Sequence, residues 1–132
     1  MPESHTVISL RDLQDHAAAG GFGDSMEARF ARSELNAETV GVSLQRIKPG
    51  KRGSFAHRHG QDEEIYVVVA GDGRALVDGT IVDLPPWCAL RVAPSSVRAF
   101  EAGTDGLELL AFGAHTEGDT ELLEADWPES RS

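Results

Sequence analysis

The chain has 132 residues and a mass of 14.2 kDa, the size of one domain with room for a hydrophobic core. Acidic side chains outnumber basic ones 22 to 12, and a net charge of -10 repels polyphosphate, which excludes nucleic acid as an expected partner. Short apolar runs exclude a membrane-spanning helix, and a single cysteine excludes an internal disulfide. Because the N-terminus also lacks the basic and then apolar build of a secretory signal, the cytoplasm is the expected location.

The first 38 residues predict a short N-terminal region that packs on the main domain. Residues 6–10 predict a short edge strand. Ser9 followed by Asp12 resembles a capping box, which favours about two helical turns over residues 11–19. Residues 26–32 alternate small or apolar side chains with charged ones, as a half-buried strand does.

From residue 39 onward the pattern predicts one strand after another. Residues 39–48 are β-branched and alternating, and Pro49-Gly50 ends them. The nearly continuous apolar run 65–70 predicts a strand covered on both faces, followed by a turn at residues 71–73. Asp78-Gly79 is a strong signal for a hairpin that joins residues 74–77 to 80–84.

Three further strands are predicted at residues 88–92, 97–101 and 107–113, with turns at residues 94–96 and 103–106. Evenly spaced short strands with Gly and Pro turns favour an all-β sandwich or barrel. Residues 114–132 lose the β pattern and carry many acidic side chains. We expect them to form a surface strap or a partly disordered acidic tail.

The strongest chemical signal is a pair of histidines followed by a glutamate. His57 and His59 are one residue apart on an extended segment, so their side chains point to the same face. Glu64 follows five residues after His59 and can face both once the chain has turned. Two imidazole nitrogens and one carboxylate oxygen are ligands for a divalent ion such as Zn, Fe, Ni or Mn. The alternative is that the three are polar core residues with no ion between them.

The stretch PGKRGSFAHRHGQDEEIYVVVAG resembles the first motif of the cupin superfamily, with Gly50, His57, His59, Glu64 and Gly71 at its fixed positions. One residue more than usual separates Gly50 from His57. The resemblance covers residues 39–113 and implies a single antiparallel jelly-roll barrel, often dimeric. It also implies a metal or a small ligand inside the barrel, and no organic cofactor is expected.

The second cupin motif is where this sequence departs from the family. At the position where the family usually has a fourth metal ligand, a histidine, this chain has Arg98. Arginine stays protonated in proteins and cannot coordinate a metal. Arg98 could swing away from the site, occupy the place of the metal beside Glu64, or hold an anionic ligand. Tyr66 and Phe100 are the other residues expected to line the ligand pocket.

Three functions are compatible with these residues. The first is a cupin barrel that binds a small, anionic molecule beside an incomplete, three-ligand metal site. The second is a metal-dependent isomerase or dioxygenase that acts on a small substrate with a carboxylate. The third is a barrel that serves as a dimerisation or accessory module. The fold alone cannot choose among them, because one fold supports many chemistries.

Overall fold

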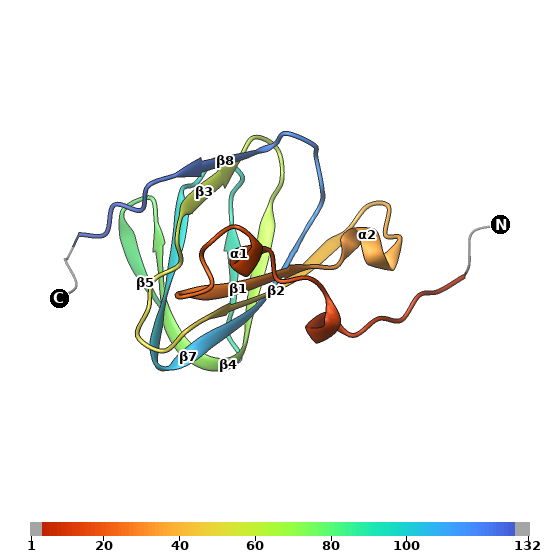
Figure 1. Ribbon diagram of the computed structural model, residues 1–132. Helices are drawn as coiled ribbons and strands as arrows, with labels where there is room; N and C mark the ends of the chain where they lie inside the picture. Colours follow the sequence, from red (N-terminus) through yellow and green to blue (C-terminus); the bar gives the residue numbers. More distant parts are fainter. Residues whose placement is uncertain (1–3, 129–132) are drawn as a thin grey trace.

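The computed structural model of the protein describes residues 4–128, and expectations for residues 1–3 and 129–132 lie outside it. The described chain is almost entirely antiparallel β-structure, curled into a barrel (Figure 1). Its strands are β1 (Met26–Phe30), β2 (Gly41–Ile47), β3 (Ala56–His59), β4 (Glu64–Val77), β5 (Thr80–Leu84), β6 (Ala89–Val92), β7 (Arg98–Gly113) and β8 (Thr120–Leu123). Among these residues, no helix has the length and apolar character needed to cross a membrane.

The two longest strands, β4 and β7, form the centre of the sheet. They pair with each other from Glu64 opposite Gly113 to Val77 opposite Arg98. On the side of β7 the strand order is β1-β2-β7-β3-β8, while β4 also pairs with β5 and β6. Because the long strands bend and pair on both sides, the sheet closes around a buried interior. The predicted all-β jelly-roll barrel is confirmed.

The predicted turns at residues 71–73 and 103–106 are wrong. Both segments lie inside continuous strands, β4 and β7, where the pairing register shifts between Val68 and Ala70 and again between Gly71 and Gly73. Such irregularities bend a strand without ending it. Gly71 and Gly106 both have positive φ, at 71° and 86°, a conformation in which glycine has no steric penalty. The hairpin at Asp78-Gly79 is confirmed, with Val77 opposite Thr80.

The run from residue 65 to residue 70 is covered on one face only, which corrects the predicted two-sided strand. Tyr66 and Val68 are each 1% exposed and point into the barrel, whereas Ile65 is 41% exposed on the outside. Ile65 lies opposite Phe112 of β7, so these two side chains share the outer face of the sheet. The inner face packs against the main core, which includes Ile47, Leu107 and Leu109.

The N-terminal region differs from the prediction in detail. Residues 6–9 are not a strand, and the predicted helix is divided into η1 (Leu10–Asp12) and α1 (His16–Ala19). The division occurs at Asp15, whose carboxylate caps α1 and also accepts a hydrogen bond of 3.0 Å from the amide of Ala28 in β1. This contact ties the helix to the barrel. A second helix, α2 (Arg32–Leu35), follows β1 and was not predicted.

The described part of the C-terminal segment, residues 114–128, runs over the barrel as a strap and contains β8, a strand that the sequence did not predict. Strand β8 pairs with β3 along one side of the barrel (Figure 1). Further on, the Trp127 ring lies 4.7 Å from the Arg52 guanidinium, a cation–π contact. Nε of Arg52 in turn donates a 2.7 Å bond to the buried Glu101. The strap is therefore attached at β3 and again near residue 127.

Replacing Gly71 with alanine should destabilise the fold by about 3–5 kcal/mol. A Cβ atom there would lie 2.0 Å from the carbonyl oxygen of Gly106, so the β4–β7 bulge could not keep its geometry. Gly79→Ala is the matched control, because Gly79 also has positive φ but no atom within 4 Å of the added carbon. It should cost only about 1–2 kcal/mol. Chemical denaturation measures both values, and equal losses would contradict the steric explanation.

Candidate metal centre

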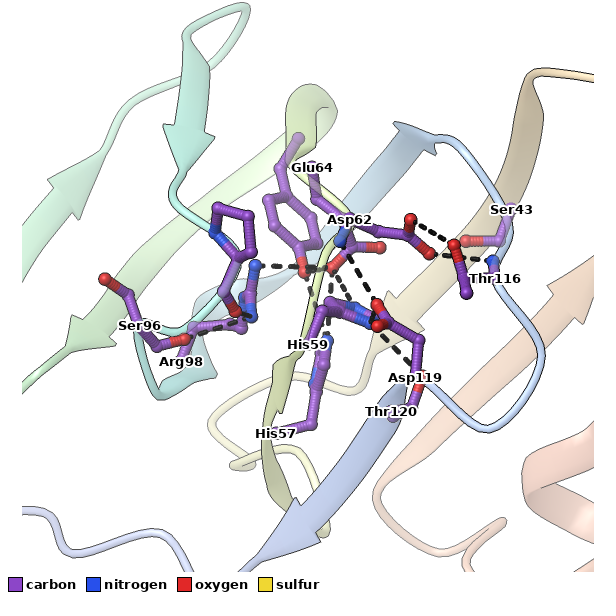
Figure 2. Close-up of polar contacts among 12 residues, drawn as sticks. Ser43, His57, His59, Asp62, Glu64, Ser96, Arg98, Thr116, Asp119 and Thr120 are labelled. Carbon is purple, nitrogen blue, oxygen red and sulfur yellow. Dashed lines mark hydrogen bonds and ion pairs between the residues drawn. The ribbon is translucent and has the colours of Figure 1, made fainter.

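Strands β3 and β4 bring the three predicted ligands together (Figure 2). His57 and His59 share one face of β3, and Glu64 is the first residue of β4 after the connecting turn. Nε2 of His57 lies 3.2 Å from Oε1 of Glu64, and Nε2 of His59 lies 3.0 Å from the same oxygen. The three side chains are therefore a group whose donor atoms could hold one metal ion.

The carboxylate of Glu64 is the centre of this group. The Tyr66 hydroxyl donates to Oε1 of Glu64 and lies 3.3 Å from Nε2 of His57. Burial on its own would raise the pKa of Glu64. The hydrogen bonds from His57 and Tyr66, and the nearby charges of His57 and His59, outweigh burial and lower that pKa to about 2. Glu64 is thus an anion at neutral pH, and an anion is the form that binds a metal.

Burial raises the pKa of Tyr66 well above its ordinary value, and the negative charge of Glu64 adds to the effect, although Arg98 opposes it. The Tyr66 hydroxyl therefore keeps its proton at neutral pH and acts as a donor to Glu64. Its ring packs at 4.7 Å from the ring of Phe100, which restricts the orientation of the hydroxyl.

Arg98 points inward and is 0% exposed. Its Nη2 atom lies 3.7 Å from Oε1 of Glu64. Its Nη1 atom donates to the carbonyl oxygens of Ser96 at 3.0 Å and Pro94 at 3.3 Å, and Nη2 donates to that of Ala93 at 3.5 Å. Of the three arrangements considered, the structure shows Arg98 paired with Glu64 and held there by the turn that precedes β7 (Figure 2).

A large open cavity of about 890 Å³ lies next to this group. His57, His59, Glu64 and Phe100 all line it, so the predicted ligands face the space in which a small molecule would fit. Much of the remaining wall is apolar and comes from β1, β2 and the loop before β3, with Met26, Phe30, Ile47 and Phe55 among its residues. Tyr66 and Arg98, expected in the pocket wall, lie beneath it and contact Glu64 from below.

Two of the three distances between the donor atoms fit a metal ion, and all three donor atoms lie within 4.8 Å of one another. Ligand atoms bound to one ion at about 2.0–2.2 Å, at tetrahedral or octahedral angles, lie about 3–3.5 Å apart. The two distances from the histidine nitrogens to Glu64, 3.2 Å and 3.0 Å, fall in this range. The buried cation of Arg98 opposes a second cation, but the carboxylate between them offsets part of that repulsion.

The surroundings of His59 support the same conclusion. Its Nε2 atom faces Glu64, while its Nδ1 atom lies 3.5 Å from Oδ2 of Asp119 and 3.2 Å from the hydroxyl of Thr120. A neutral imidazole carries one N–H and cannot donate to a carboxylate on each side. An ion on the Nε2 side would leave the proton on Nδ1, facing Asp119, an arrangement common around metal-binding histidines.

Sequence reasoning did not find Asp119 or its neighbours Asp62 and Thr116. Asp62 lies in the turn between the histidines and Glu64, and both of its carboxylate oxygens accept hydrogen bonds from Thr116. In the sequence, Asp119 is one of many acidic residues near the C-terminus, and no spacing distinguishes it from the others. Only the pairing of β8 with β3 brings it to His59.

No protein-family model matches the chain, and no curated protein matches it either. Several solved structures, in contrast, are similar to the chain in fold. A cupin protein from Bacteroides fragilis is 22% identical with a TM-score of 0.70, covering 89% of each chain. A putative sugar phosphate isomerase from Acidithiobacillus ferrooxidans is 18% identical with a TM-score of 0.65, covering 78% of this chain and 73% of its own.

Oxalate decarboxylase from Bacillus subtilis is 20% identical with a TM-score of 0.71 over 89% of this chain, which spans only 33% of that larger protein. At these identities the likeness concerns the fold. Together with the β4–β7 barrel and its inward His, His and Glu side chains, it shows that the chain folds as a small cupin-type domain.

Replacing Arg98 with methionine should destabilise the protein by about 3–5 kcal/mol, because removing one partner of a buried ion pair takes away the fixed positive charge that compensates the other partner. The carbonyl oxygen of Ser96 would also lose its hydrogen bond from Arg98, and those of Ala93 and Pro94 would keep only their backbone donors. Arg98→Lys keeps the positive charge but lacks the planar set of N–H donors of the guanidinium, and it should lose less stability than Arg98→Met. Urea denaturation at neutral pH measures both variants. A loss below about 0.5 kcal/mol for Arg98→Met would contradict this role, since such a loss is typical of exposed positions.

Proposed function

We propose that the barrel binds a divalent transition metal ion, one of Zn, Fe, Ni or Mn, through His57, His59 and Glu64. Beside the ion, we propose that it binds a small molecule with an anionic oxygen group. The observation that carries this proposal is the approach of both Nε2 atoms to one carboxylate oxygen at the wall of a large cavity. Three protein ligands leave coordination positions for that molecule.

The residues around the ion would have distinct roles. A bound divalent ion supplies Lewis acidity, which polarises an oxygen of the small molecule. His57 and His59 donate nitrogen lone pairs, and Glu64 contributes the negative charge. Tyr66 donates a hydrogen bond to Glu64 and orients the carboxylate. Phe100 and the apolar wall would contact the body of the small molecule and exclude water from it.

We propose that Arg98 acts through Glu64 and not on the bound molecule. Its side chain is fully buried, and both terminal nitrogens of its guanidinium are already engaged by the turn carbonyls and by Glu64. The charge of Arg98 partly neutralises Glu64 and so lowers the affinity of the site for a cation. A metal held here would bind more weakly than at a site with a histidine in the same place.

An enzyme is the second candidate function. The similar structures named as a putative sugar phosphate isomerase and as oxalate decarboxylase favour oxygen-rich anions as first ligands to test. A metal-dependent isomerase or dioxygenase acting on a small carboxylate substrate would use the same three ligands and the same cavity. The cytoplasmic location expected from the sequence stays a prediction.

Protein purified without chelator, or reconstituted with Co²⁺ after chelation, should contain about one metal ion per chain at the site of three ligands. The double variant His57→Ala, His59→Ala should lose the metal, because two of three ligands are gone. His16→Ala, His115→Ala is the matched control, since both histidines line the same cavity but are not among the donor group. Elemental analysis measures the metal content of each variant. Oxalate added to the Co²⁺-loaded protein should change its visible spectrum. Wild-type protein without metal after reconstitution would overturn the proposal.

We also propose that two chains associate through the outer face of the central strands. Ile65, exposed at 41%, and Phe112 share this face, and Val67 lies opposite Leu110 on it. Burying such a surface against a second copy would remove apolar area from water. Light scattering should report a dimer mass, and Ile65→Lys should shift it toward the monomer. A monomeric mass for the wild type would contradict the association.

A further inference from the structure

One carboxylate near the proposed metal centre comes from outside the motif. Asp119 lies in the connection between β7 and β8, and its side chain is 4% exposed. Its Oδ2 atom is 3.5 Å from Nδ1 of His59, on the opposite side of the ring from Glu64 (Figure 2). Asp119 therefore faces the one His59 nitrogen that is directed away from the other ligands.

We propose that Asp119 is a positioning residue for His59. It holds the imidazole with a proton on Nδ1, so that the lone pair of Nε2 is available to a metal ion. This inference rests on the proposed function. Through Asp119, the C-terminal strap would contribute to the site, although it lies beyond the region that resembles the cupin family.

The geometry shows that the carboxylate is held in place. Oδ1 of Asp119 accepts a 2.8 Å hydrogen bond from the amide of Gln61, and Oδ2 accepts one of 3.1 Å from the amide of Asp62. A Cβ atom on Gly60 would lie 2.9 Å from Oδ1, so glycine leaves room for the approach. With both oxygens engaged by the turn after His59, the side chain has little freedom to turn away.

The strap itself is anchored on the other side of the same turn. Thr116 donates its hydroxyl to Oδ1 of Asp62 at 2.9 Å, and its amide donates to Oδ2 at 2.9 Å. Asp62 thus holds the strap, while Asp119 holds the turn and faces His59. His57 lacks a comparable partner, since within residues 4–128 its Nδ1 atom has no hydrogen bond. The two ligands are therefore supported unequally.

The test compares three single variants of the full-length chain, each titrated with Zn²⁺ after chelation. Asp119→Asn keeps the size of the side chain but removes the negative charge that faces Nδ1, together with one of the two oxygens that accept from the turn amides. It should raise the dissociation constant for Zn²⁺ about 10- to 100-fold. Thr116→Val loosens the strap without touching His59 and should change the constant less than about twofold by the same reasoning. Thr120→Val removes the hydroxyl near Nδ1 and should have a smaller effect than Asp119→Asn.

The second readout is the protonation of His59 measured by ¹⁵N NMR. In the Zn²⁺-loaded wild type, Nδ1 should carry the proton, and in Asp119→Asn this preference should weaken. Equal losses of Zn²⁺ affinity in Asp119→Asn and Thr116→Val would overturn the inference, because Asp119 would then only anchor the strap. A loss in Thr120→Val with none in Asp119→Asn would overturn it as well.

The two proposals can fail separately. If the wild type takes up no metal, the proposed function is wrong, and Asp119 is then judged by the NMR of the metal-free protein. A proton on Nδ1 of His59 that is lost in Asp119→Asn would still support the positioning role. A wild type with its only imidazole proton on Nε2 would overturn that role, whatever the metal does.

Discussion

The arrangement of the site depends on one partly buried anion, the carboxylate of Glu64. An isolated charge inside a protein is costly unless it is paired and hydrogen-bonded. Here its Oε1 atom is approached by two imidazoles and by the Tyr66 hydroxyl, which keep its pKa at about 2, and Arg98 lies 3.7 Å away. The imidazoles, Tyr66 and Arg98 therefore all help to satisfy this one charge.

The barrel makes that arrangement possible because its central strands are long and bent. Strand β4 carries Glu64 and Tyr66 at one end and continues through the Gly71 bulge. Strand β7 begins with Arg98 and pairs with the far end of β4. Curling of the sheet then places Arg98, opposite His57 in β3, beneath the same carboxylate. A flat sheet would leave these residues apart.

Arg98 and Asp119 give the site a charge pattern that the cupin motif alone does not contain. Arg98 places a fixed cation below Glu64, and Asp119 places a fixed anion behind His59. In the proposed metal centre, the first would weaken the attraction of the site for a metal ion and the second would strengthen it. Residues outside the three proposed ligands would therefore contribute to the affinity.

The sequence by itself predicted the fold class and singled out the three candidate ligands and Arg98, because strand periodicity and motif spacing are local properties of the chain. The turns predicted from the sequence at residues 71–73 and 103–106 were wrong. A glycine in a β-bulge and a glycine in a turn give the same local sequence signal until the partner strand is known. Asp119 became visible only in the tertiary structure. Sixty residues separate it from His59, and only the pairing of β8 with β3 closes that distance.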